Sequence, residues 1–156
     1  MIKIPTIEQM NKNIEYYCSL KTDELVTFGK SYVERYPNTF ALGCLVAPSN
    51  SPSAEIILMG ALLLHSLESA NGPLRESDMD VMSEYLLFGH LNLEMDDEQK
   101  ETLYPLLNYI IRVGINLKVK PTDEDMISFL SAILTSIAHA HNYVPELLIN
   151  LHEENT

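Results

Sequence analysis

Apolar residues recur every three or four positions along most of this chain, which is the spacing of one face of an α-helix. Thr6 and Gln9 have the spacing of a capping box, so we expect a first helix to begin directly after Thr6. Further helices are predicted to begin at capping residues, early acids or prolines: Thr22, Ser51, Ser77, Asp96 or Asp97, Thr122 and Pro145. This pattern is typical of an all-α protein.

One segment, residues 53–70, is apolar nearly all round, and its residues 56–64 include no polar side chain. A helix that is apolar on every face is stable only when other helices surround it. We therefore predict a multi-helix bundle of about six or seven helices around a buried central helix near residues 53–70. Gly72, which precedes a proline, is expected to end that helix.

Two short segments depart from the helical spacing. Residues 115–120 alternate strictly between apolar and polar side chains, which predicts a short extended segment. Residues 40–48 have two interpretations: a short helix capped by Asn38, or an extended chain over residues 42–46.

The chain of 156 residues has the length of one domain, so we predict a single helical domain over residues 1–156 with frayed ends at 1–5 and 152–156. The two cysteines, Cys18 and Cys44, do not form a CxxC pair, which is typical of thiols in a reducing compartment. The first residues lack the pattern of a secretory leader. The longest apolar run is about half the length of a membrane-spanning helix. We therefore expect a cytoplasmic protein without membrane contact.

The formal net charge is −12 at pH 7, which argues against direct binding to the phosphates of nucleic acid. Residues 1–40 are neutral overall, whereas residues 76–101 contain nine acids and one base. Some of these acids offset helix dipoles, but the block is denser than that role needs. We predict that it contacts a basic surface of a partner protein, for example of a nucleic-acid-binding protein. The predicted partner-binding residues are these acids and one tyrosine: Glu76, Asp78, Asp80, Glu84, Tyr85, Glu94, Asp96, Asp97, Glu98 and Glu101.

Motifs for catalysis are absent from the sequence. Gly29-Lys30-Ser31 matches the end of a phosphate-binding loop, but the first glycine of that motif is missing and the tripeptide lies inside a predicted helix. The chain has no GxGxxG, GxSxG or HExxH motif, so we expect no cofactor and no catalytic residue. His65 and Glu68, three residues apart, are an alternative metal or acid–base pair, although a histidine hydrogen-bonded to a carboxylate is the commoner arrangement.

Three functions are therefore compatible with the sequence. The leading one is an acidic, non-catalytic protein-binding module of the inhibitor, immunity or adaptor type. The second is an enzyme or small-ligand binder that uses a pocket beside the central helix, with His65 and Glu68 as its polar pair. The third is a self-associating structural domain, a homo-oligomer in which two copies share Leu62, Leu63 and Leu64 across a two-fold interface.

Overall fold

The computed structural model describes residues 4–47, 53–72, 82–84, 86, 97–117 and 124–142. The helices assigned in these ranges are α1 (Ile7–Ser19), α2 (Thr22–Arg35), α3 (Pro37–Val46), α4 (Ala54–Asn71), α6 (Asp97–Asn116) and α7 (Glu124–Asn142). Within the same ranges no residue belongs to a strand. The predicted all-α class is confirmed.

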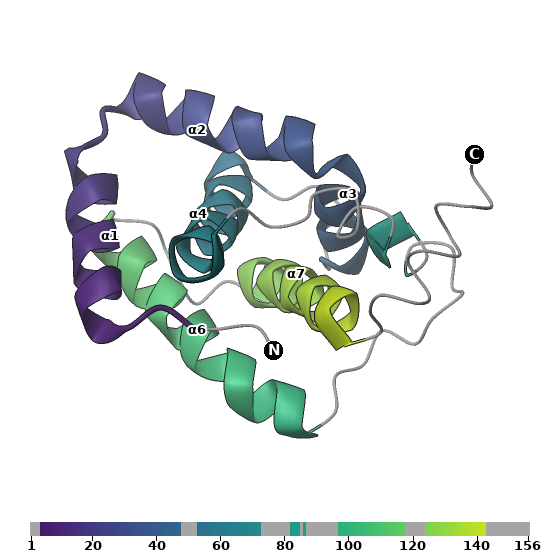
Figure 1. Ribbon diagram of the computed structural model, residues 1–156. Coiled ribbons are helices and arrows are strands. Elements are labelled where there is room, and N and C mark those ends of the chain that lie inside the picture. Colours follow the sequence, from purple (N-terminus) through teal and green to yellow (C-terminus); the bar gives the residue numbers. More distant parts are fainter. Residues whose placement is uncertain are drawn as a thin grey trace.

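The helices are arranged around α4, which lies in the middle of the molecule (Figure 1). Helices α1, α2, α6 and α7 all contact α4, whereas α3 packs mainly against α7. Because neighbours cover α4 on several sides, its apolar residues are removed from water on nearly its whole circumference. The multi-helix bundle around a central helix near residues 53–70 is thus confirmed.

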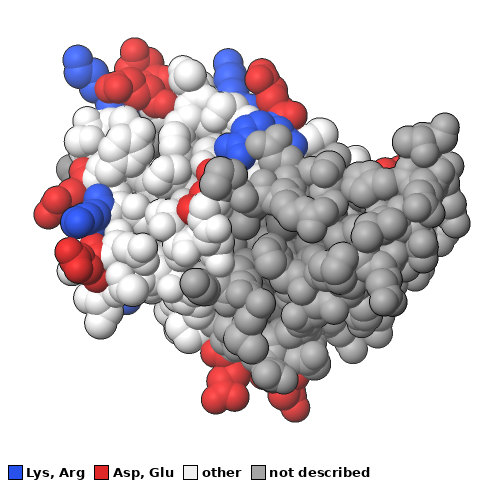
Figure 2. Space-filling view, viewed as in Figure 1, with Lys and Arg blue, Asp and Glu red and all other residues white. Residues whose placement is uncertain are grey.

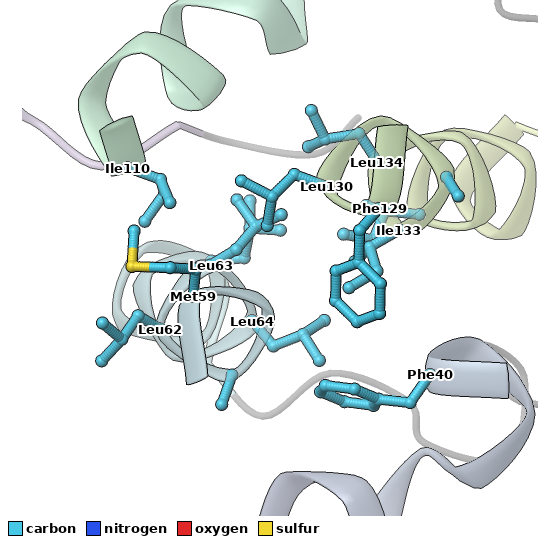
Figure 3. Close-up of a cluster of buried hydrophobic side chains, with 14 of the residues drawn as sticks. Phe40, Met59, Leu62, Leu63, Leu64, Ile110, Phe129, Leu130, Ile133 and Leu134 are labelled. Atoms are coloured by element: carbon cyan, nitrogen blue, oxygen red, sulfur yellow. The ribbon is translucent and has the colours of Figure 1, made fainter. Parts of the chain in front are cut away.

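The three leucines in the middle of α4 belong to the core of a single copy of the chain. Leu62, Leu63 and Leu64 are each 0% exposed. Figure 3 shows them together with Leu130 of α7 and Ile110 of α6. The prediction that these leucines are shared between two copies is therefore wrong, because helices of the same chain already cover them.

The starts of the first two helices follow the local sequence. The hydroxyl of Thr6 accepts a hydrogen bond from the backbone N–H of Gln9 at 3.2 Å, and the Gln9 side chain accepts one from the Thr6 N–H at 2.8 Å. The predicted capping box is confirmed. Helix α2 begins at Thr22, as predicted, and Glu24 accepts a bond from the Lys21 N–H at 3.0 Å.

The central helix begins later than its sequence suggested. Ser53, not Ser51, is the capping residue of α4, and its hydroxyl accepts a hydrogen bond from the Ile56 N–H at 3.4 Å. The pattern misled because Ser51 and Ser53 are both good caps two residues apart. The end is as predicted: α4 stops at Gly72, whose φ of +75° suits a residue without a Cβ atom.

The extended segment predicted for residues 115–120 is wrong where the structure describes it. Ile115 and Asn116 belong to α6, and the N–H of Leu117 donates a helical bond to the Val113 carbonyl at 3.0 Å. The apolar–polar alternation does not follow burial here, because Ile115 is 57% exposed. Residues 118–120 lie outside the described ranges.

The ambiguous segment after α2 is helical, so the extended alternative for residues 42–46 is wrong. Helix α3 begins at Pro37, and Asn38 therefore lies inside its first turn instead of capping it. Proline suits this position because its ring fixes φ near the helical value and no helical partner is needed for its missing N–H.

Two predicted helices fall mostly outside the described residues. Of the helix expected from Ser77, residues 82–84 and 86 are described and are helical, and the helix expected from Pro145 is not described. The extent of the domain and its frayed ends stay predictions. Among the described helices, none is both long and apolar enough to cross a bilayer.

Candidate functional site

Polar side chains of α4 gather in the C-terminal half of this helix, where α1 and α2 cover it. His65 faces Tyr17 of α1, and Glu68 faces Arg35 of α2. Ser69 adds a third contact, because its hydroxyl accepts a hydrogen bond from the Asn13 side chain at 3.0 Å. His65 and Glu68 therefore lie toward the same part of the bundle, as their three-residue spacing predicted.

His65 is held by one hydrogen bond inside a group of aromatic rings. Its Nδ1 lies 2.7 Å from the hydroxyl of Tyr17, and its ring lies 5.3 to 5.8 Å from the rings of Tyr16, Tyr17 and Phe28, centroid to centroid. Burial lowers the pKa of His65, and the nearby Glu68 carboxylate opposes this shift. Burial also raises the pKa of Tyr17, so the phenol stays protonated and can donate a hydrogen bond to a neutral imidazole.

We expect His65 to make the protein less stable as the pH falls below about 6.5, the usual pKa of histidine in an unfolded chain. Because the pKa of folded His65 is lowered, the unfolded chain binds the proton first, and its protonation draws the equilibrium away from the folded state. The contribution of neutral His65 to the free energy of unfolding is fully present above about pH 6.5. It is lost as the pH falls from that value to the lower pKa of His65 in the folded state.

Urea unfolding of the wild type and of His65→Asn at about pH 7.5 and about pH 5.5 checks this expectation. The asparagine keeps an acceptor near the Tyr17 hydroxyl but does not titrate in this range. The variant should lose less stability on acidification than the wild type. Equal losses in the two proteins would show that another group is responsible.

Three side chains form hydrogen bonds with Glu68: two belong to α2, and the third belongs to Tyr36, which follows this helix. The guanidinium of Arg35 donates to its carboxylate at 2.7 Å, and the hydroxyls of Tyr32 and Tyr36 donate at 2.8 and 3.2 Å. The same guanidinium lies over the two tyrosine rings, 4.9 and 5.2 Å from their centroids. Burial and the carboxylate raise the pKa of Tyr32, which keeps this phenol a donor. The carboxylate thus fastens the end of α2 to α4.

The two polar residues do not form the histidine–carboxylate pair that the sequence favoured. His65 is hydrogen-bonded to Tyr17, and Glu68 to residues of α2 and its cap. Within the described ranges, no group of three or more His, Cys, Asp or Glu side chains is placed to hold a metal ion. The arrangement therefore gives no support to a metal or acid–base role for this pair, and it accounts for both residues as ties between helices.

Most of the predicted partner-binding residues lie outside what the structure describes. Glu84, Asp97 and Glu101 are described and exposed. The side chain of Glu98 is not described, although its backbone belongs to α6. The others lie outside the described ranges: Glu76, Asp78, Asp80, Tyr85, Glu94 and Asp96. Whether these acids form one surface stays a prediction.

An apolar groove runs along α2 and the first turns of α4. It has a volume of about 610 Å³ and is partly open to solvent. The walls include Leu25, Val26 and Val33 of α2 and Ile57 and Leu58 of α4. Pockets of about 300–1,000 Å³ with mostly apolar walls are typical of binding sites in proteins.

Charged side chains stand at the edges of this groove. Glu34 and Lys30 of α2 and Glu55 of α4 contribute to its lining, and all three are exposed. Elsewhere around α1 and α2, acidic and basic side chains alternate over the surface (Figure 2), in keeping with the neutral sum of residues 1–40. The lining of the groove, with two acids and one base, has a negative balance.

The sequence did not reveal this groove, because the apolar residues of its walls have the same helical spacing as residues buried in the core. Val26 and Val33 belong to the apolar stripe that predicted α2, yet Val26 is 50% exposed. A signal was present in Gly29, a glycine in the middle of that stripe. The tripeptide Gly29-Lys30-Ser31 does lie inside α2, as predicted, and Gly29 belongs to the lining of the groove.

Comparisons with known proteins give no relative from which a site could be transferred. No family model matches the chain, and searches of curated proteins and of solved structures gave no significant match.

Proposed function

We propose that this protein is an acidic, non-catalytic binding module that docks onto a basic surface of a partner protein. The observation that carries the proposal is the open apolar groove between α2 and α4 in a chain with a net charge of −12. An apolar centre gives an interface its burial energy, and opposite charge steers the partner toward it.

The polar contacts of α4 support a binding role over a catalytic one. Tyr17, His65 and Glu68 all take part in hydrogen bonds that join helices. A catalytic base needs a reacting group within hydrogen-bond reach, and the described bonds of these side chains are directed to other parts of the fold. These bonds assign the three side chains a role in holding the helices together.

A second candidate is a binder of small apolar ligands, because the same groove lies beside the central helix and has a suitable volume. The two candidates differ in their response to salt. Binding of a basic protein weakens as salt screens the charges, whereas binding of an uncharged small molecule does not.

Charge reversal is expected to weaken partner binding without changing the fold. Proteins captured from the native host on the immobilised chain would be identified, and the affinity of the main one measured at about 50 and about 500 mM salt. The triple variant Glu84→Lys, Asp97→Lys, Glu101→Lys removes three exposed acids of the predicted surface. We expect about tenfold weaker binding at low salt and a smaller dependence on salt.

The matched control reverses the charge of three exposed acids in the N-terminal part of the chain: Glu8→Lys, Glu15→Lys and Asp23→Lys. It changes the net charge by the same amount, so it separates a local surface from the overall charge. Equal weakening by both variants would make the interaction a general charge effect. An affinity indifferent to salt and to both variants would contradict the proposed function.

A further inference from the structure

Gly29 is a buried glycine in the interior of α2, at a position where a Cβ atom would meet no clash. A Cβ atom built at Gly29 would meet only Leu58, at the ordinary contact distance of 3.9 Å. Glycine weakens a helix interior relative to alanine, so it is usually found there where two elements approach closely. At Gly43 and Gly60 such an approach exists, because a Cβ would lie 2.6 and 2.8 Å from the Phe129 ring.

The effect of a glycine at this position is to deepen the groove. Gly29 is part of the lining, and the side chains on either side of it along α2 are Val26 and Val33. Gly29 is buried against Leu58 of α4 and has no side chain, so the wall of the groove is hollowed between the two valines. A large aliphatic side chain from outside the protein would fit such a hollow, as anchor residues of bound helices do.

The groove follows α2 over most of the length of this helix. Its lining on α2 extends from Thr22 to Glu34, which at about 1.5 Å per residue is roughly 18 Å of helix, or more than three turns. An occupant that uses this length is elongated and presents apolar side chains at helical intervals. An amphipathic helix with anchors at positions i, i+3 or i+4, and i+7 has this form.

The charges at the edges favour a basic occupant. Glu34 and Glu55 stand on the two walls, on α2 and α4, and they outnumber Lys30, the one base of the described lining. Neither acid forms an ion pair with another described residue. A helix with basic residues on both flanks of its apolar face would pair with both acids. The chain's own C-terminal residues 143–156 match this less well, because their charged residues are Glu146, Glu153 and Glu154.

We propose that the groove between α2 and α4 is the docking site for an amphipathic, basic helix of the partner protein, with one large aliphatic side chain seated over Gly29. This inference rests on the proposed function and specifies the site and the form of the partner. It places the apolar centre of the interface at α2 and α4, whereas the sequence alone pointed to the acids of residues 76–101.

A synthetic peptide of leucine and lysine tests the inference directly. The probe is a fluorescent peptide of about fifteen residues with leucines at helical spacing, and its control has the same composition with strict alternation. We expect the helical peptide to bind the wild type, measured by fluorescence anisotropy, and to bind Gly29→Leu about tenfold more weakly or not at all, because the new side chain fills the hollow. The double variant Glu34→Lys, Glu55→Lys should also weaken binding.

Matched variants separate blocking of the groove from damage to the fold. Ser31→Leu adds the same side chain to α2 at an exposed position outside the groove and should leave binding unchanged. Gly29→Ala fills the hollow only in part and should give an intermediate loss. Circular dichroism and thermal melting of each variant check that the helices are intact, since a folded Gly29→Leu protein is required for the comparison.

The possible failures of the two proposals can be told apart. If Gly29→Leu and the wild type bind both peptides equally and salt abolishes the binding, the groove assignment is wrong and the acidic module is supported. If Gly29→Leu blocks binding that is indifferent to salt, the groove is supported and the role of charge is wrong. A wild type that dimerises while Gly29→Leu stays monomeric would show that a second copy of the chain occupies the groove, and would contradict docking of a partner helix. Loss of binding of an apolar dye on Gly29→Leu, without peptide binding, would give it to a small ligand.

Discussion

Replacing Glu68 with alanine should lower the free energy of unfolding by about 2–3 kcal/mol. The carboxylate accepts hydrogen bonds from Arg35, Tyr32 and Tyr36, so its removal takes one acceptor away from each of three donors. Side chains of Glu68 and Arg35 are 16% and 31% exposed, so water compensates the guanidinium in part. The expected loss is therefore smaller than for a fully buried pair. Urea denaturation of the variant and the wild type at neutral pH measures it.

Two controls locate the cause of this loss. Glu68→Gln keeps the shape and one oxygen acceptor but removes the charge, so it should lose about half as much stability. Glu8→Ala removes an ion pair with Lys12 whose atoms lie 3.5 Å apart and whose side chains are 81% and 74% exposed, and it should change stability by less than about 0.5 kcal/mol. If Glu68→Ala changed stability as little as Glu8→Ala, the carboxylate would not be the tie between α2 and α4.

The local signals for helices could be read from the sequence where they depend on neighbouring residues. The capping box of Thr6 and Gln9 is such a signal, because both partners lie within one turn. The unbroken apolar run in residues 56–64 likewise predicted a helix surrounded by others. At residues 115–117 the signal failed, since alternation predicts a strand only when alternate residues are buried, and Ile115 is mostly exposed.

The candidate site could be predicted only in part, because its partners come from distant parts of the chain. The spacing of His65 and Glu68 placed them on neighbouring positions of one helix. It could not show that Tyr17, 48 residues away, would form a hydrogen bond with the histidine, or that Arg35 of α2 would form one with the carboxylate. The groove depends in the same way on how α2 lies against α4. Gly29 was the one indication of the groove in the sequence. Only the structure shows that a Cβ atom at Gly29 would lie 3.9 Å from Leu58 and would not clash.

Alanine at Gly60 or Gly43 should destabilise the protein by about 2–3 kcal/mol, whereas alanine at Gly29 should stabilise it by about 0.5–1 kcal/mol. The Phe129 ring reaches from α7 toward α3 and α4 (Figure 3), and it is 0% exposed. A Cβ at Gly43 would lie 2.6 Å from ring atom Cε2, and a Cβ at Gly60 would lie 2.8 Å from Cε1. The two glycines thus contact opposite edges of one ring.

This placement prevents the ring from relaxing, because a movement away from one new methyl group brings it against the backbone of the other helix. The gain in helix propensity from alanine is smaller than this overpacking and does not offset it. At Gly29 the same gain meets no clash, since Leu58 is 3.9 Å away. Urea denaturation of the three single variants tests the contrast, which uses one substitution in three helices. A shift of the same sign in all three would mean that helix propensity, and not the space around Phe129, decides the outcome.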